Sequence, residues 1–222
     1  MDEAIRVIAF DVDGTLYGKA AYGSRMFCSL FPDPFLALRY SRARKAYRVE
    51  QAASPTVGAG RDGYLSRLAS LMGSRNERRT VRAVERQMYG CWRRVYRKVR
   101  PRPLMRETLL LLKKKGYRLA VLSDFPLEGK LKALGIASLV DVALCSEDTG
   151  YLKPDGRVFD ALLASVHARP EEVLFVGDSY HKDVLGAKGA GMRSCLLTNR
   201  RRIYPDADYV VHSFKEFAVL FN

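Results

Sequence analysis

The chain has 222 residues and a net charge of +14, and its composition is 48% hydrophobic and 28% charged. This balance excludes wholesale disorder and is sufficient for one sizeable core, or for a core unit that carries a smaller second one. No stretch approaches the roughly 20 apolar residues needed to cross a bilayer, so we expect no membrane-spanning segment.

The first apolar run covers residues 5 to 10 and ends abruptly at Asp11-Val12-Asp13-Gly14-Thr15. A β-rich run that stops at Asp and Gly predicts a buried strand followed by a turn. Side chains two positions apart on an extended segment point the same way, so Asp11 and Asp13 can share a site.

Residues 17 to 100 show helical periodicity and no convincing strand pattern. The periodic stretches cover residues 35 to 51, 61 to 72 and 76 to 98. Pro101 and Pro103 then mark the return to a different pattern. We therefore expect an all-helical cap at residues 17–100, inserted into a core made of residues 1–16 and 101–222.

Beyond the prolines, apolar β-rich runs alternate with helical patterns. The runs cover residues 118 to 122, 140 to 145, 173 to 176, 193 to 197 and, less clearly, 209 to 211. The helical patterns cover residues 104 to 115, 127 to 134, 157 to 167 and 181 to 190, and three of them close with a glycine, as helices often do. This alternation predicts an α/β core with a parallel sheet and helices on both faces.

All the excess positive charge lies in the segment expected to be helical. Residues 17 to 100 hold 19 Lys and Arg against 5 Asp and Glu, and the rest of the chain is balanced. Arg78, Arg82 and Arg86 follow one another at intervals of four, a spacing at which each like-charged pair costs about 0.2 to 0.5 kcal/mol in an isolated helix. A solvated face tolerates that cost and a face that binds anions exploits it, so both interpretations stay open.

Polar residues follow each of the first four predicted strands. In an open parallel sheet, ligands bind beyond the carboxyl ends of the strands, so these residues are the candidates for a functional site. They are Asp11, Asp13, Ser123, Asp124, Lys153 and Asp178, with Asp183 one helical turn later.

This set of side chains indicates phosphate chemistry with a hard metal ion. Carboxylates placed this densely repel one another unless a cation lies among them, and oxygen ligands suit magnesium. Two neighbouring carboxylates in unlike surroundings acquire different pKa values, which permits an ionised nucleophile beside a proton donor. Ser123 and Lys153 offer a hydroxyl and a fixed cation to phosphoryl oxygens.

Four ordered segments carry a family resemblance. They are D-V-D-G-T-L at 11 to 16, L-S-D at 122 to 124, K-P-D at 153 to 155 and V-G-D-S-Y-H-K-D at 176 to 183. Together they resemble the motifs of haloacid dehalogenase-like hydrolases, over residues 5 to 16 and about 101 to 197. The resemblance implies a Rossmann-like core, a helical cap at the inserted segment, and a magnesium-dependent phosphomonoesterase acting on a small phosphorylated metabolite.

The resemblance also implies a role for each candidate. Asp11 matches the nucleophile that forms an aspartyl-phosphate, and Asp13 matches the acid and base that serves the leaving oxygen and then the hydrolytic water. Magnesium would be held by the Asp11 carboxylate, the Asp13 carbonyl and Asp178, with Asp183 in support. The implied phosphate-binding residues are Ser123, Asp124 and Lys153.

Two positions bear on which reaction the resemblance implies. The dehalogenating branch lacks an acid at the position of Asp13, so phosphate chemistry is favoured. Asp124 stands where many relatives have Asn, and its charge would repel a phosphate unless the side chain turns away.

Other functions remain open from the sequence. The same fold could catalyse phosphoryl transfer within a substrate, as a phosphomutase, or cleave a carbon–phosphorus bond with a cap lysine, for which Lys19, Lys45 and Lys98 are present. The basic cap could instead bind nucleic acid or another anionic surface, although it contains no recognised nucleic-acid motif. Substrate identity and oligomeric state are not predicted.

Localisation is expected to be cytoplasmic. The four cysteines form no C-x-x-C pair and indicate neither a zinc site nor a disulfide framework, so reduced thiols are expected. The first residues are too acidic, and their apolar run too short, for a signal peptide.

Overall fold

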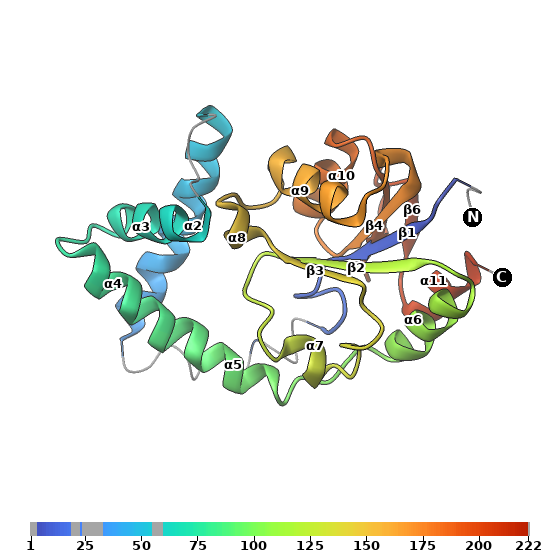
Figure 1. Ribbon diagram of the computed structural model, residues 1–222, viewed down its shortest axis with the longest axis horizontal. Coiled ribbons are helices and arrows are strands. Elements are labelled where there is room, and N and C mark those ends of the chain that lie inside the picture. The colour runs from blue at the N-terminus through green and yellow to red at the C-terminus, as the bar shows by residue number, and fades with distance from the viewer. Residues whose placement is uncertain (1–3, 19–22, 24–32, 55–59, 222) are drawn as a thin grey trace.

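The computed structural model describes residues 4–18, 23, 33–54 and 60–221, and its centre is a six-stranded parallel sheet (Figure 1). The strand order is β3-β2-β1-β4-β5-β6, so the chain winds outward from β1 in both directions. The strands are β1 (Val7–Phe10), β2 (Arg118–Ser123), β3 (Val142–Cys145), β4 (Val173–Gly177), β5 (Arg193–Leu197) and β6 (Tyr209–Val211). The predicted parallel sheet is confirmed, including its short last strand.

Helices cover both faces of the sheet because successive strand residues point to opposite sides. Ile8 and Phe10 of β1 pack in one hydrophobic cluster with residues of α6 (Met105–Lys114) and α11 (Phe214–Val219). Val7 and Ala9 pack in a second cluster with residues of α9 (Gly156–Val166) and α10 (Leu185–Gly189). The two clusters are the layers above and below the sheet, as the α/β interpretation predicts.

The helices of the α/β part differ from the predicted ones mainly in length. The pattern at 127 to 134 yields only α7 (Lys130–Ala133), and α10 is preceded by a π-helical turn, η4 (Tyr180–Val184). The short helix α8 (Ser146–Thr149), the 3-10 turn η3 (Pro170–Glu172) and α11 were not predicted. Each has six residues or fewer, too few to show a clear helical period.

Every regular element that the structure describes between β1 and α6 is a helix. They are α2 (Pro34–Ala53), α3 (Gly60–Leu71), α4 (Glu77–Val84), the π-helical turn η2 (Glu85–Tyr89) and α5 (Gly90–Tyr96). Asp33 begins α2 by accepting a 3.0 Å hydrogen bond from the Leu36 amide, and Pro34 follows in the first turn. The predicted cap at 17–100 includes positions 19–22, 24–32 and 55–59, which lie outside the described residues.

The predicted helix at 76 to 98 is present as α4, η2 and α5 in succession. Trp92, Tyr89 and Tyr96 are buried on its inner side, as expected for packing residues. Arg78, Arg82 and Arg86 are exposed on its outer side. This continuous helical stretch is therefore amphipathic, with the arginine row in solvent.

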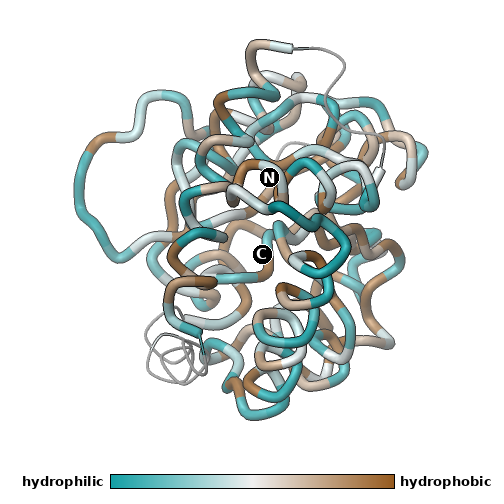
Figure 2. Tube along the Cα trace, turned by 90° about the vertical axis from the view of Figure 1, so that its left-hand side faces the viewer, coloured by the Kyte–Doolittle hydropathy of each residue, from teal (hydrophilic) through white to brown (hydrophobic). Residues whose placement is uncertain are grey.

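Hydropathy changes at short intervals along the chain. Figure 2 shows hydrophilic and hydrophobic residues alternating over the coloured part of the tube. Within the described ranges, no helix combines the length and the apolar character needed to cross a membrane.

Candidate active site

The register of the central strands brings the candidate residues to one edge of the sheet. Phe10 at the end of β1 lies beside Val121 of β2 and Val176 of β4. The Asp11 amide extends this ladder by donating a 2.8 Å hydrogen bond to the Val176 carbonyl. Polar residues that follow these strands therefore converge at their carboxyl ends.

Asp11 is buried directly after β1 and is held by two donors. Its Oδ2 accepts a 2.8 Å hydrogen bond from Thr15 Oγ1, and its Oδ1 accepts one of 2.7 Å from Lys153 Nζ. Burial raises the pKa of the Asp11 carboxyl to about 6, while the Lys153 ammonium opposes that rise. Near neutral pH the group is thus a buried carboxylate held in a fixed orientation.

Lys153 is the buried cation at the centre of the site. Besides Asp11, its Nζ donates a 2.7 Å hydrogen bond to Asp183 Oδ1 and one of 3.3 Å to the Leu122 carbonyl. Burial alone would lower the pKa of this ammonium, but Asp11 and Asp183 outweigh burial and raise it well above its ordinary value. Lys153 therefore stays charged and fixes two carboxylates at once.

Asp13 has a different set of partners from Asp11. Its Oδ2 accepts hydrogen bonds of 2.9 Å from Ser123 Oγ and 2.8 Å from Lys130 Nζ, and its Oδ1 accepts one from the Tyr17 hydroxyl. Burial alone would raise the pKa of Asp13, but the Lys130 ammonium and these hydrogen bonds lower it. The two carboxylates of one loop are thus placed in unlike surroundings, as the sequence predicted.

Lys130 is a site residue that the sequence analysis did not identify. It is 1% exposed, and its Nζ lies 4.3 Å from the centre of the Tyr96 ring at the end of α5. It follows Gly129 at the start of the four-residue helix α7, outside all four resembling segments. Nothing in the local sequence marks it as different from a surface lysine.

Asp178 and Asp183 complete a cluster of carboxylates with Asp11. One oxygen from each of the three lies within 4.8 Å of the others. A Cβ on Gly14, whose φ is +110°, would lie 2.7 Å from a carboxylate oxygen of Asp178, so glycine is needed for this approach. Three converging carboxylate oxygens are a donor set that fits magnesium.

Asp124 is turned toward the helical segment. Its Oδ2 accepts hydrogen bonds of 3.0 Å from Arg48 Nη2 and 3.2 Å from Lys182 Nζ, and its Oδ1 accepts one of 3.0 Å from Ser146 Oγ. Burial alone would raise the pKa of Asp124, but the cations around it, Lys153 foremost, hold it well below its usual range. Neighbouring cations therefore compensate the negative charge of Asp124, which would otherwise repel a bound phosphate.

Helix α2 joins the α/β part through a buried polar network. Arg44, which is 4% exposed, donates to Glu147 and to the Asp124 carbonyl, and its guanidinium lies 4.3 Å from the centre of the Phe125 ring. Gln51 exchanges two hydrogen bonds with the backbone of Leu152, 2.6 Å to its carbonyl and 3.0 Å from its amide. These contacts fix α2 against the loop that carries Lys153.

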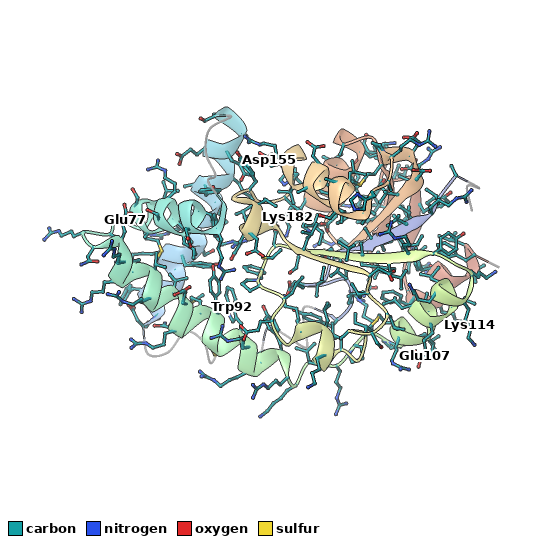
Figure 3. All side chains as sticks on the ribbon, viewed as in Figure 1. Glu77, Trp92, Glu107, Lys114, Asp155 and Lys182 are labelled. Carbon is teal, nitrogen blue, oxygen red and sulfur yellow. The ribbon has the colours of Figure 1, made fainter. Side chains whose placement is uncertain are left out.

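Figure 3 shows how the labelled side chains lie relative to this junction. Trp92 and Lys182 lie between the helical segment and the sheet, whereas Glu77 lies at the far end of the helical segment. Lys182 lies within the resembling segment at 176 to 183, whereas Arg48 lies outside all four segments.

The structure brings all seven sequence-derived candidates to the same edge of the sheet. Hydrogen bonds link Asp11, Lys153 and Asp183 in one group and Asp13 with Ser123 in another. Asp178 joins the first group through its carboxylate oxygens, and Asp124 joins through a 3.3 Å hydrogen bond from the Lys153 amide.

Comparisons with known proteins agree with the fold and with the family resemblance. A family model described as haloacid dehalogenase-like hydrolase matches residues 5–191. The glyceraldehyde 3-phosphate phosphatase of Methanothermobacter thermautotrophicus is 29% identical over 212 residues, which cover 93% of this chain and 91% of the relative.

Solved structures from two kinds of enzyme share the fold. A HAD phosphatase from Thermococcus onnurineus gives a TM-score of 0.63 at 23% identity, with 98% of each chain covered. An L-2-haloacid dehalogenase from Xanthobacter autotrophicus gives 0.66 at 16% identity, again with 98% of each chain covered. At such identities the comparison shows the architecture alone, and the reaction has to be argued from the side chains.

Proposed function

This chain belongs to the haloacid dehalogenase-like hydrolases, and on that premise we propose that it is a magnesium-dependent phosphomonoesterase that acts on a small phosphorylated metabolite. The observation that carries the proposal is the pair Asp11 and Asp13, two carboxylates of one loop with separate hydrogen-bond partners and pKa values displaced in opposite directions. A phosphatase needs a nucleophile beside a proton-transfer group, and this pair supplies both. The name of the methanogen relative supports a phosphomonoester of a small carbon skeleton as the substrate.

Asp11 is the nucleophile in the proposed mechanism. Its carboxylate oxygen attacks phosphorus, and the bond from phosphorus to the leaving oxygen breaks as the bond to Asp11 forms. Lys153 orients this carboxylate and offsets part of the negative charge in the site. A water then attacks the aspartyl-phosphate at phosphorus, releases inorganic phosphate and restores Asp11.

Asp13 transfers the protons in both halves of the reaction. It donates one to the leaving oxygen in the first half and accepts one from the attacking water in the second. Lys130 favours the carboxylate form of Asp13, which suits the second half. The negative charge of an arriving phosphoryl group opposes Lys130 and raises the pKa of Asp13, which suits the first half.

Magnesium would be held by the carboxylates of Asp11 and Asp178 and by the Asp13 carbonyl, with Asp183 in support. Bound there, it would neutralise phosphoryl charge and draw the phosphorus toward the nucleophile. Ser123 and Lys130 lie on the Asp13 side of the site and would donate to phosphoryl oxygens.

Two alternative reactions on this fold have less support. The dehalogenase branch lacks the acid that Asp13 provides. A carbon–phosphorus hydrolase needs a cap lysine at the site, and the two cap lysines that the structure describes, Lys45 and Lys98, are both exposed. Lys19, the third candidate, lies outside the described residues.

A paired assay separates the phosphatase from the dehalogenase. The purified protein with magnesium is incubated with a panel of phosphomonoesters that includes glyceraldehyde 3-phosphate, and in parallel with L-2-chloropropionate. We expect release of inorganic phosphate from at least one ester and no release of chloride. Chloride release without phosphate release would refute the proposal.

A further inference from the structure

A cavity opens beside the carboxylate cluster, since Asp178 belongs to both. Its volume is about 560 Å³, and Asp178 and Ser179 form the wall that it shares with the site. The lining also includes Arg200 and Arg202 from the loop after β5, and Arg102 from the stretch between the helical segment and α6. We call this cavity the arginine pocket.

The charge of the arginine pocket is strongly unbalanced. Among the described residues that line it are three arginines and one carboxylate, Asp178, which belongs to the proposed metal site. The other polar lining residues, such as His181 and Asn199, are hydrogen-bonding groups without a fixed charge. An anion that enters this cavity is therefore attracted from several sides.

These arginines differ from three other arginines of the α/β part in lacking acidic partners. Arg157, Arg169 and Arg193 each form an ion pair with a carboxylate at 3.1 Å or less. Within the described ranges, Arg102, Arg200 and Arg202 have no carboxylate within ion-pair distance. Their charge is therefore available to a ligand.

Arg102 connects the arginine pocket to the catalytic loop. Its Nη2 donates a 2.7 Å hydrogen bond to the Gly14 carbonyl, three residues after the nucleophile. Its Nε is buried and has no acceptor in the part of the chain that the structure describes. Arg202 is held in the cavity wall by Tyr204, whose ring centre lies 5.0 Å from the guanidinium carbon.

We propose that the arginine pocket binds a second anionic group of the substrate, so that the preferred substrates are phosphomonoesters that also carry a carboxylate or another phosphate. This inference rests on the proposed function, because it assigns the phosphoryl group to Asp11 and the second anion to Arg102, Arg200 and Arg202. Asp178 belongs both to the carboxylate cluster and to the pocket lining, so the two sites are adjacent. Arginine suits this role because its planar guanidinium donates two parallel hydrogen bonds to a carboxylate or phosphate.

The test compares two esters that differ only at the second group. 2-Phosphoglycolate carries a carboxylate, and 2-hydroxyethyl phosphate carries a neutral hydroxymethyl group in its place. For the wild-type enzyme with magnesium, we expect kcat/KM for 2-phosphoglycolate to be at least about ten-fold higher, the gain of one charge-assisted contact. The ratio of the two kcat/KM values is the readout, because it is independent of the fraction of active protein.

The double variant Arg200→Gln/Arg202→Gln should bring this ratio close to one, mainly through a higher KM for 2-phosphoglycolate. Arg201→Gln is the matched control, since Arg201 is exposed in the same loop and does not line the pocket. It should leave the ratio unchanged. A wild-type ratio at or below one, or an unchanged ratio in the double variant, would overturn the inference.

A failure of the proposed function can be distinguished from a failure of the inference about the arginine pocket. If the wild-type enzyme releases no phosphate from either ester, the phosphatase assignment is wrong, and calorimetric binding of the two esters then decides the inference alone. Selective binding of 2-phosphoglycolate that the double variant loses supports the arginine pocket. Equal affinities for the two esters refute it.

Discussion

The α/β part and the helical segment of this molecule place their charges in opposite ways. At the carboxyl edge of the sheet, Lys153 contacts Asp11 and Asp183, and Lys130 contacts Asp13, so each buried ammonium lies against an opposite charge. In the helical segment the arginine row of α4 and η2 faces solvent. Isolated buried ions are very costly, so a buried and paired set of this density indicates function more strongly than an exposed row.

At the junction between the two regions, the helical segment also has buried or partly buried charges that are paired. Arg44 is as buried as the site lysines and is paired with Glu147, while Arg48 reaches the Asp124 carboxylate. Helix α2 thus contributes charge to the neighbourhood of the site, whereas α4 and η2 contribute charge to the surface. Substitutions in the two regions should therefore have unequal effects.

Asp11→Asn should lower phosphate release by at least about a thousand-fold, because an amide of the same shape cannot attack phosphorus. Steady-state turnover of the best ester measures the loss. Circular dichroism of the variant should match that of the wild-type protein. A folded variant that retains more than a few per cent of the activity would disprove the nucleophile assignment.

Breaking the buried ion pair at the junction should destabilise the protein far more than breaking an exposed one. In the Arg44–Glu147 pair the side chains are 5% and 0% exposed, and Arg44→Met leaves a buried carboxylate uncompensated, at a cost of about 3 to 5 kcal/mol in the free energy of unfolding. In the Arg93–Glu128 pair they are 47% and 71% exposed, and Arg93→Met should cost at most about 1 kcal/mol.

Urea unfolding of both variants measures this contrast. The double variant Arg44→Met/Glu147→Gln should recover part of the loss, because no unpaired charge remains. Equal costs for Arg44→Met and Arg93→Met would show that the junction does not depend on its buried charges.

Magnesium affinity should depend on pH through Asp11. The carboxyl has its pKa raised to about 6 by burial, so a proton competes with the metal below that pH. The affinity should therefore fall toward ten-fold per pH unit below about pH 6 and level off above it. Calorimetric titration with magnesium between pH 5 and about 8 measures the profile, and Asp11→Asn should remove this inflection.

The raised pKa of Asp11 also predicts how the stability of the metal-free fold changes with pH. A pKa raised from 3.8 to about 6 means that the folded state binds the proton more tightly than the unfolded state. The stabilising contribution of Asp11 is therefore fully present below pH 3.8 and is lost as the pH rises through about 6. Comparing the free energy of unfolding of the wild-type protein with that of Asp11→Asn, both in a chelator, isolates this contribution. If the wild-type protein instead gained stability relative to the variant as the pH rises from 3.8 to about 6, the expectation would be contradicted.

Neutralising the arginine row should have the smallest effect. Arg78→Gln/Arg82→Gln/Arg86→Gln should raise KM a few-fold and flatten the decrease of kcat/KM between about 50 and 200 mM salt, since exposed charges act on substrate only through the screened field. The matched control removes the same charge from exposed lysines of the α/β part: Lys114→Gln/Lys115→Gln/Lys132→Gln. Equal salt profiles for the two triple variants would leave the arginine row without a role in steering substrate.

The sheet was predictable because each strand is a short apolar run that ends at a polar turn. All six runs are strands, and the polar residues after the first four meet at one edge because parallel strands share a direction. The short helices α8 and α11 were missed because four to six residues show no clear period.

Lys130 and Arg48 could not be predicted for a different reason. Each reaches the site through tertiary contacts, with the Tyr96 ring for Lys130 and with the Lys153 carbonyl for Arg48. A lysine or arginine on a helix is exposed in most proteins, so the sequence alone does not indicate that Lys130 is buried or that Arg48 pairs with Asp124.

The central claim is that the buried carboxylate of Asp11 becomes phosphorylated during turnover. Borohydride reduces an aspartyl-phosphate to homoserine, so the enzyme is mixed with magnesium and its best ester, treated with borohydride, digested and examined by peptide mass spectrometry. We predict homoserine at position 11 in the presence of ester and none in its absence or in the Asp11→Asn variant. Rapid phosphate release with position 11 unmodified, or with the modification at Asp13, would contradict the claim.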